Sequence, residues 1–328
     1  MAVDGNALEQ IAQRYRRFAD VEAQAASPQY AALARVVVQS PALLTFLAGL
    51  PAERQQPNLF LAAVRATCGV PGDGAQLQRD VDRHGDAIAA LMRERTTQTN
   101  EPARCAVLLP VLARLAQPLA LIEVGASAGL CLLPDRYGYD YGGSGVAPTS
   151  GHDATAPVFR CRANAATPLP AGNVEVVWRA GLDLNPLDVT RDADMAWLQT
   201  LVWPEQQARS RRLADAIAVA RRDPPRIVAG DLLSDLPALA ATAPTDATLV
   251  IYHTAVLSYV SDAADRAAFA DTIAALDAVW ICNESPRVMG QRADAAPPPP
   301  EPGLFLMSVD GRPVAWTGPH GQSIHWFD

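Results

Sequence analysis

The chain has 328 residues, of which 49% are hydrophobic and 19% charged, and its formal net charge is −8. This composition is typical of a folded globular protein with one large or two ordinary domains, and it excludes a disordered chain. The negative charge gives no electrostatic help to binding nucleic acid or an anionic membrane, so we expect neither as a partner. All 27 basic side chains are arginine, which excludes a Schiff-base lysine, a pyridoxal-phosphate anchor and a P-loop lysine.

The first residues are polar and no charge-free apolar run is long enough to cross a bilayer, so we expect a cytoplasmic protein without a signal peptide. The five cysteines are scattered and contain no C-x-x-C pair, which favours free buried thiols over disulfides or zinc ligands. Cys131 follows a glycine-rich turn, where a helix dipole could lower the pKa of its thiol, and it is therefore a candidate reactive cysteine.

Residues 1–118 are predicted to be helical. Apolar residues recur near the helical period at Leu8–Tyr15 and Phe60–Val64, and prolines separate the segments. Alternating strand patterns are absent. We therefore predict an all-α N-terminal domain over 1–118, acting as a helical cap.

The stretch that follows combines a strand with a tight turn. Leu119–Val124 is a short apolar run typical of a buried strand, Gly125–Gly129 is rich in small residues, and Leu130 begins an apolar segment expected to be helical. Glycines allow the chain to turn sharply and a ligand to approach the backbone. Three interpretations stay open: a cofactor-binding turn, a nucleophile elbow of the form G-x-S-x-G with Ser127 as nucleophile, and a turn without a ligand.

From Leu119 onward, strand-like runs alternate with helix-like ones, which predicts a doubly wound, mostly parallel sheet with crossover helices. The expected parallel strands are Leu119–Val124, Val174–Leu182, Arg226–Ala229, Ala247–Tyr252 and Ala278–Cys282. Leu304–Val309 and Pro313–Trp316 then predict an antiparallel hairpin, and Ser323–Phe327 a further strand. The predicted second domain covers residues 119–328.

Polar residues stand at the ends of these strands, where the edge of a parallel sheet would bring them together. Asp183 ends the second strand, at the place of a ribose-binding carboxylate, although it lies much farther from the glycine turn than the usual spacing of about 20 residues. Asp231 is suited to accept a hydrogen bond from a purine amino group, or to cap a helix. His253 and Glu284 end the fourth and fifth strands and are candidates for a catalytic base.

Aromatic residues offer two further alternatives. Tyr137, Tyr139 and Tyr141 alternate along one segment, so they share a face that either stacks on a flat ligand or covers a sheet edge. Trp197 and Trp203 are either core aromatics or the rim of a cofactor cleft.

No metal site is predicted. His84 lies among three aspartates without a ligand spacing, which favours a solvated helix face. His320 and His325 are five residues apart, so on one strand they would point to opposite faces.

Taken together, these motifs resemble a known family. Glu123-x-Gly-x-x-x-Gly129, Gly181-x-Asp183 and Gly230-Asp231, with a closing hairpin, are similar to class I S-adenosylmethionine-dependent methyltransferases. More closely, the sequence resembles an uncharacterised bacterial family called domain of unknown function 2332. The phrases that carry this second resemblance are Ile122–Leu130, Asp135–Tyr137, Gly181–Pro186, Trp197–Leu198, Val202–Pro204, Gly230–Asp231, His253–Val256, Asn283–Glu284 and Pro319–Gly321.

The resemblance implies a Rossmann-like fold, S-adenosylmethionine as cofactor and a role for each matching position. The residues expected around the amino-acid part of the cofactor are Glu123, Gly125, Ala126, Ser127 and Gly129. Those expected around its nucleoside are Asp183, Leu184 and Asn185 at the ribose, and Asp231 and Leu232 at the adenine. The residues expected at the methyl group or the acceptor are His253, Thr254 and Glu284, with Tyr137, Trp203, Tyr259 and His320 as further substrate contacts.

We therefore expect a methyltransferase that acts on a small-molecule acceptor, and the sequence favours no particular oligomeric state. One alternative is a serine hydrolase in which Ser127 is followed by Asp231 and by His253 or His320. Another is a nucleoside-binding or scaffold protein that has the fold but no turnover.

Overall fold

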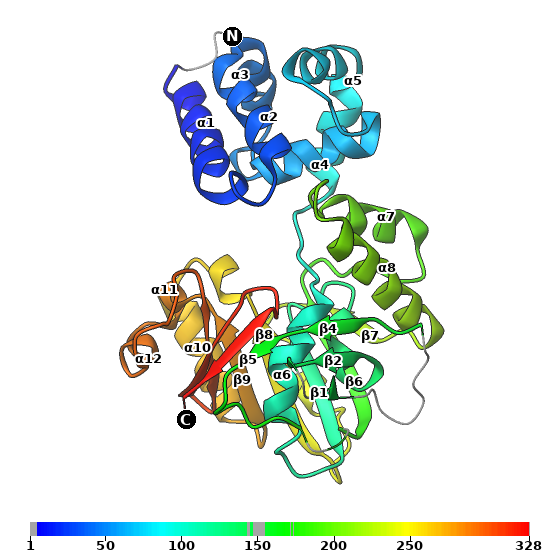
Figure 1. The fold of residues 1–328 in the computed structure, drawn as a ribbon, viewed down its shortest axis with the longest axis vertical. Coiled ribbons are helices and arrows are strands. Elements are labelled where there is room, and N and C mark those ends of the chain that lie inside the picture. Colours follow the sequence, from blue (N-terminus) through cyan, green and yellow to red (C-terminus); the bar gives the residue numbers. More distant parts are fainter. Residues whose placement is uncertain (1–4, 143–144, 147–154, 171, 173, 328) are drawn as a thin grey trace. The chain divides into compact units, whose positions relative to one another are not determined.

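The computed structural model describes residues 5–142, 145–146, 155–170, 172 and 174–327 (Figure 1). The chain divides into two compact units. The helical unit comprises Met1–Thr99 with Ala193–Arg211, and the sheet unit comprises Asn100–Asp192 with Arg212–Asp328. Each unit is described separately below.

The described part of the helical unit contains only helices and their connections. Its elements are α1 (Gly5–Arg17), η1 (Phe18–Ala23), α2 (Pro28–Gln39), α3 (Pro41–Ala48), η2 (Ala52–Arg54), α4 (Pro57–Cys68), α5 (Gly74–Glu94), most of α7 (Asp192–Thr200) and the start of α8 (Gln207–Arg222). Ser27, Ser40 and Asp73 each accept a backbone N–H at the start of a helix, and proline occupies the first turn of α2, α3 and α4. The N-terminal region is thus helical, but its compact unit ends at Thr99 and takes in Ala193–Arg211, whereas the prediction had a single domain over 1–118.

Trp197 and Trp203 belong to the core of the helical unit. Trp203 packs edge-on against Phe18 and donates its indole N–H to Asn58 Oδ1 at 2.9 Å, and Trp197 donates to the Thr96 carbonyl at 3.0 Å. Both indoles therefore have the partners expected of core aromatics.

No single described helix is both long and apolar enough to span a membrane. Only α2 and α3 taken together reach that length and hydropathy, and the chain bends by 90° between them.

The sheet unit is built on a nine-stranded sheet with the order β5-β12-β11-β10-β9-β8-β1-β6-β7. The parallel strands are β1 (Leu119–Val124), β6 (Val176–Asp183), β7 (Arg226–Ala229), β8 (Thr248–Thr254) and β9 (Val279–Glu284). The strands β10 (Phe305–Val309), β11 (Arg312–Thr317) and β12 (Ser323–Trp326) continue it in antiparallel fashion, and β5 (Arg162–Ala163) pairs with β12. The predicted mixed α/β architecture with a mostly parallel sheet is confirmed, and each predicted strand agrees with an observed one to within two residues.

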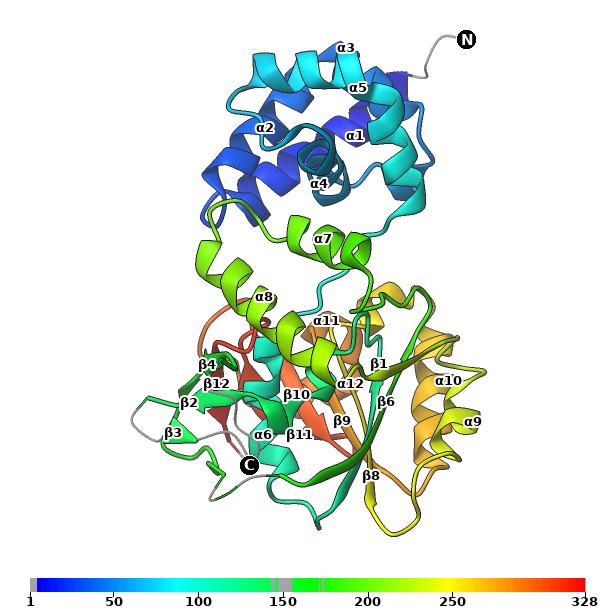
Figure 2. The same cartoon turned by 90° about the vertical axis from the view of Figure 1, so that its right-hand side faces the viewer.

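Side-chain alternation divides the sheet into two faces, and Figure 2 shows helices on both sides of it. One face, here called the α10 face, packs Ile122, Leu182 and Ile251 against Phe269 and Ile273 of α10 (Ala263–Ala274). The other, the α6 face, carries Glu123, Asp183 and Thr254 and lies on the side of α6 (Cys105–Leu112). The remaining elements of this unit are α9 (Leu236–Ala240), α11 (Pro286–Met289), α12 (Gln291–Asp294), β2 (Gly138–Asp140), β3 (Gly145–Val146), β4 (Val158–Arg160), η3 (Pro102–Arg104), η4 (Leu130–Leu132), η5 (Pro134–Arg136) and η6 (Leu257–Tyr259).

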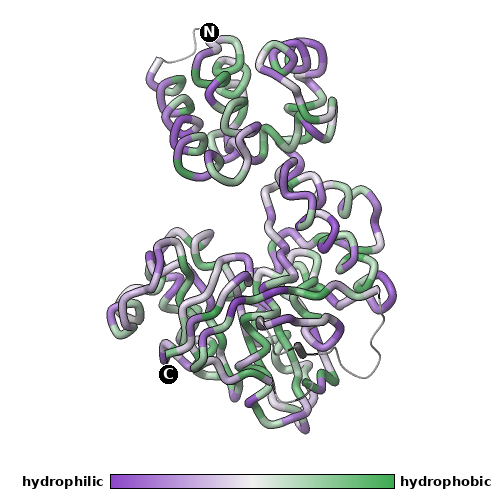
Figure 3. The backbone as a smooth tube through the Cα atoms, viewed as in Figure 1, coloured by the Kyte–Doolittle hydropathy of each residue, from purple (hydrophilic) through white to green (hydrophobic). Residues whose placement is uncertain are grey.

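The interior of the sheet unit is largely hydrophobic along the backbone trace, as are several helices of the helical unit (Figure 3). All six residues of β1 are buried, as expected for the middle strand of a sheet covered on both faces.

The segment after the glycine turn differs from its prediction. Leu130 opens only the single turns η4 and η5, separated by Leu133 and followed by extended backbone at Tyr137, in place of an α-helix. Without a helix there is no dipole to activate Cys131. A hydrogen bond with Cys105 and burial instead raise the pKa of its thiol well above the ordinary value, so the reactive-cysteine hypothesis is wrong.

The three tyrosines of this segment are buried and hold it in place. Tyr137, Tyr139 and Tyr141 donate their hydroxyl groups to the carbonyls of Leu130, Pro134 and Ala106. Ligand stacking by these rings is thus excluded, and they are structural.

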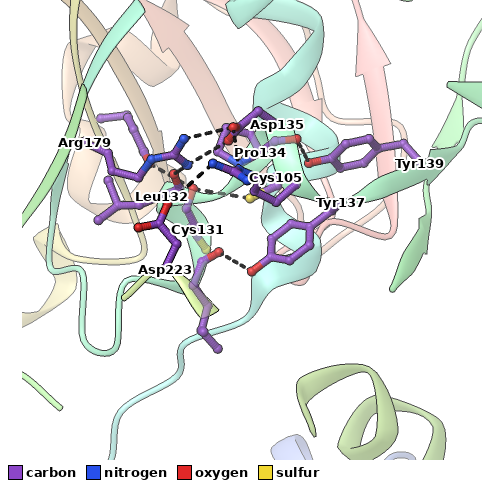
Figure 4. Close-up of polar contacts among 12 residues, drawn as sticks. Cys105, Cys131, Leu132, Pro134, Asp135, Tyr137, Tyr139, Arg179 and Asp223 are labelled. Atoms are coloured by element: carbon purple, nitrogen blue, oxygen red, sulfur yellow. Dashed lines mark hydrogen bonds and ion pairs between the residues drawn. The ribbon is translucent and has the colours of Figure 1, made fainter. Parts of the chain in front are cut away.

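An ion pair anchors the same segment to the sheet. Arg179 of β6 donates two hydrogen bonds of 2.7 and 2.9 Å to the Asp135 carboxylate and a third of 2.7 Å to the Leu132 carbonyl (Figure 4). This bidentate geometry fixes the turns that follow the glycine loop onto the α6 face.

Candidate functional site

The turn after β1 requires its small residues. Gly125 and Gly129 both have φ +72°, and Ser127 between them has φ +52°. A Cβ on Gly125 would lie 2.4 Å from Val256 Cγ2, and one on Gly129 would lie 2.6 Å from Ile227 Cδ1. The turn is therefore pressed between the loop after β8 and strand β7, and larger residues would displace it.

Asp183 fixes the turn from the neighbouring strand. One carboxylate oxygen, Oδ2, accepts the Ser127 backbone N–H at 2.7 Å, and Oδ1 accepts the Asn185 N–H at 2.8 Å. The prediction that Asp183 lies beside the glycine turn agrees with this geometry, although the two are 56 residues apart in the chain. Each oxygen keeps a lone pair that can accept a further hydrogen bond.

Asn100 holds the turn from the opposite side and was not predicted. Its side-chain amide donates to the Ala126 carbonyl at 3.2 Å and its Oδ1 accepts the Leu130 N–H at 3.0 Å. The side chain is buried, so both backbone groups depend on it. The sequence shows only that a polar residue lies just before Pro102. Its two partners are 26 and 30 residues away, so local patterns could not predict these hydrogen bonds.

Glu123 is the buried acid of the site. It is 2% exposed, and its Oε2 has no hydrogen-bond partner within the described part of the chain. Burial and the nearby Cys131 raise the pKa of the Glu123 carboxyl well above the ordinary value, while Arg104 opposes the shift. A buried carboxyl oxygen without a partner in the described chain is a group that a polar ligand can satisfy.

The raised pKa of Glu123 predicts a specific pH dependence. Between the unfolded-state pKa of about 4.3 and the higher folded-state pKa, the folded protein binds the extra proton, so its stability falls as pH rises. Glu123→Gln mimics the protonated acid and should remove that fall, gaining about 1.4 kcal/mol per pH unit across the window. Urea unfolding from about pH 5 to about pH 8 measures this, with the exposed Glu175→Gln as control. Parallel stability curves for wild type and Glu123→Gln would contradict it.

Arg104 is a second residue that the sequence did not single out. The side chain is 5% exposed, and its Nη1 donates to the Thr254 carbonyl at 3.0 Å and to Thr254 Oγ1 at 3.2 Å. Its Nε donates to the Pro319 carbonyl at 3.0 Å. Thr254, a predicted site residue, therefore holds the buried guanidinium of Arg104 at the edge of the sheet.

Asp231 and Leu232 lie on the loop after β7, next to the same edge. The Gly230 N–H donates to the Asp183 carbonyl at 3.0 Å, which joins the two loops. Asp231 Oδ1 accepts the N–H groups of Leu233 and Ser234 at 2.8 and 3.4 Å. One oxygen of Asp231 thus closes the turn that precedes α9, and the helix-capping alternative is wrong because the N-cap residue of α9 is Asp235.

His253 and Glu284 lie on the other face of the sheet from Glu123 and Asp183. His253 is fully buried against Phe269 of α10, with Nδ1 2.7 Å from Glu284 Oε1. Glu284 Oε1 also accepts the Val256 N–H at 2.7 Å, so the pair holds the loop that covers Gly125. The predicted base candidates are therefore brought together with each other and linked to the turn through Val256.

The proton of His253 is assigned by its second neighbour. The Trp280 indole N–H donates to His253 Nε2 at 3.1 Å. Burial lowers the pKa of His253 whereas Cys282 and Glu284 raise it, and these effects alone would give a pKa of about 10. If Nε2 were protonated, two N–H donors would face each other, because the indole N–H of Trp280 cannot accept a hydrogen bond. We therefore assign a neutral His253 ring that donates from Nδ1 to Glu284.

Exposed residues surround this edge of the sheet. Leu184 is 65% and Tyr259 72% exposed, and both are large apolar side chains next to site residues. Partial burial raises the pKa of Tyr259 and Arg104 lowers it, and Asp183 also acts on it, so the phenol lies near both charges. Asn185 and His320 are exposed as well.

The remaining predicted substrate contacts lie elsewhere, since Tyr137 is buried behind the turn and Trp203 is in the core of the helical unit. Within the described residues, no group of three or more histidine, cysteine, aspartate or glutamate side chains could hold a metal ion.

The comparisons identify a family and no individual relative. Neither the curated proteins nor the solved structures contain a match to the chain. A family model described as "Uncharacterized protein conserved in bacteria (DUF2332)" matches residues 12–70 and 71–326, which is nearly the whole chain. The chain therefore belongs to the DUF2332 family.

Proposed function

We propose that this protein is a cytoplasmic S-adenosylmethionine-dependent methyltransferase that acts on a small-molecule acceptor. The observation that carries the proposal is the contact between Asp183 Oδ2 and the Ser127 N–H, which places an acid of the second parallel strand against the bend after the first. In nucleotide-binding doubly wound sheets an acid at this place accepts the two ribose hydroxyls. The open lone pairs of Asp183 are suited to that task.

The topology supports the proposal. The parallel strands follow the order β7-β6-β1-β8-β9, which is the order 3-2-1-4-5 of a Rossmann-like sheet. The glycine turn follows β1, where the winding of the chain reverses, and ligands of open α/β sheets bind at such switch points. The exposed Leu184 beside Asp183 offers an apolar surface to a purine ring.

The residues have distinct proposed roles in the reaction. Bound S-adenosylmethionine would supply an electrophilic methyl group. Catalysis then depends mainly on holding the acceptor in line with that group. Glu123, whose Oε2 has no partner in the described chain, would face the amino-acid part, whereas His253 and Glu284 act indirectly by fixing the Val256 loop. Tyr259 and His320, at the exposed rim, are the side chains we assign to the acceptor.

Isothermal titration of the full chain with S-adenosylhomocysteine, the demethylated product, tests the proposal. We expect saturable binding with one site per chain. No heat at millimolar ligand, about the weakest affinity of interest, would overturn it. Binding without methyl transfer to any acceptor would support a nucleoside-binding protein without turnover.

A serine hydrolase is the second candidate, because Ser127 lies in a G-x-S-x-G turn with φ +52°. It ranks lower since Ser127 is only 4% exposed and the Nε2 lone pair of His253 is already used by Trp280. Labelling of Ser127 by a fluorophosphonate probe would reverse this ranking.

A further inference from the structure

The buried guanidinium of Arg104 lacks the partner that such a group normally has. All three of its hydrogen bonds go to neutral oxygens, on Thr254 and Pro319. Among the residues that the structure describes, no carboxylate forms an ion pair with it. A buried charge is costly unless it is paired, so this arrangement is expected only where a counter-charge arrives from outside the chain.

The acid nearest in effect does not supply that charge. Arg104 acts on the Glu123 carboxyl, but in the described chain no ion pair or hydrogen bond joins the two side chains, and burial raises the pKa of Glu123. By contrast, Arg179 of the same unit, whose side chain is 12% exposed, is neutralised by its two bonds to Asp135. Arg179 therefore has a carboxylate partner within the described chain and is structural, whereas Arg104 has none there and could bind an anionic ligand.

Part of the guanidinium is left to bind one. Nε and Nη1 are engaged, whereas Nη2 carries two N–H groups that meet no acceptor in the described chain. The three bonds hold the planar group rigidly, so little side-chain entropy is lost when an anion binds. Its partner Thr254 ends β8, which pairs in parallel with β1, so the cation lies at the sheet edge from which the glycine turn starts.

We infer that Arg104 binds a carboxylate of a ligand at this edge of the sheet, through its unpaired Nη2. The inference rests on the proposed function only for the source of that carboxylate. Either the amino-acid part of the cofactor provides it, or the methyl acceptor is itself a carboxylic acid.

The experiment compares wild type with Arg104→Gln by isothermal titration of the full chain. The probes are S-adenosylhomocysteine, 5′-methylthioadenosine, which lacks the amino-acid part, and succinate added to the protein with S-adenosylhomocysteine present. We expect Arg104→Gln to weaken one carboxylate probe by about 10- to 100-fold and to leave methylthioadenosine unchanged. Arg226→Gln, an exposed arginine that begins β7, is the matched charge control.

The probe that responds identifies the source. Loss of S-adenosylhomocysteine binding assigns the carboxylate to the cofactor, and loss of succinate binding alone assigns it to the acceptor. Unchanged affinity for both in a folded variant overturns the inference. If no adenosine ligand binds but succinate binding alone depends on Arg104, the anion site stands and the methyltransferase proposal falls.

If Arg104→Gln does not fold, Arg104→Lys is the variant to titrate, because lysine keeps the positive charge but lacks the planar set of guanidinium N–H donors. Its affinity for the responding probe should fall between wild type and zero binding. A wild-type protein that binds S-adenosylhomocysteine no better than methylthioadenosine, and does not bind succinate, would also overturn the inference.

Discussion

Asp183→Ala should weaken the binding of S-adenosylhomocysteine by about 100-fold or more. Two hydrogen bonds from ribose hydroxyls to a carboxylate contribute about 3 kcal/mol or more, and the alanine variant loses both. It also loses the acceptor of the Ser127 N–H at 2.7 Å, so the turn that faces the ligand is no longer fixed. Isothermal titration of the folded variant measures the change in affinity.

The chain offers a close control for this variant in Asp188. Its Oδ1 accepts the Thr190 N–H at 2.8 Å, just as Asp183 Oδ1 accepts the Asn185 N–H, but Asp188 is exposed, whereas Asp183 is half-buried and also accepts the Ser127 N–H. Asp188→Ala should bind the ligand as wild type does. A folded Asp183→Ala with wild-type affinity would remove the contact on which the proposed function depends.

The contrast between these acids shows what the sequence could predict. The apolar runs were long enough and separated by enough helix to give the parallel strands, because burial on both faces leaves a clear pattern. The end of β6 also predicted a position for Asp183 at the sheet edge, since the ends of parallel strands share an edge. Asp183 and Ser127 are 56 residues apart in the chain, but β6 pairs directly with β1 and brings them together.

Other parts of the site could not be predicted from local patterns. Asn100 and Arg104 come from the connection between the units, and only their long-range hydrogen bonds reveal a role. The apolar segment at Leu130 resembled a helix, yet Pro134 and the buried tyrosines hold it as single turns. The apolar residues of this segment are buried, as their hydrophobicity predicts, but the predicted α-helix is wrong.

The position of His253 depended on strand alternation, which the sequence contained. His253 is two residues from Ile251 and so shares its face, whereas Thr254 shares the face of Tyr252 and Glu123. Counting in twos from the buried residues therefore separates Thr254, which contacts Arg104, from His253, which contacts α10.

This separation leads to the second large effect, which concerns stability. Glu284→Ala should lower the free energy of unfolding by about 2–5 kcal/mol, because two buried N–H donors lose their acceptor at about 1–3 kcal/mol each. The variant leaves the Nδ1–H of His253 and the Val256 N–H without their acceptor. Urea unfolding measures the loss, and Glu301→Ala, an exposed acid 3.9 Å from Arg162, should cost less than about 1 kcal/mol.

A double variant distinguishes a structural pair from a catalytic one. Replacing both partners by apolar residues, as in His253→Leu with Glu284→Leu, removes the unpaired Nδ1–H but leaves the Val256 and Trp280 N–H groups without acceptors, so it should recover only part of the stability lost in Glu284→Ala. If the pair acts only by fixing the Val256 loop, the stable double variant should still bind S-adenosylhomocysteine, with an affinity reduced by less than about 10-fold. Full ligand binding together with complete loss of methyl transfer would instead show that His253 or Glu284 takes part in the chemistry, and the loop would have to open to expose them.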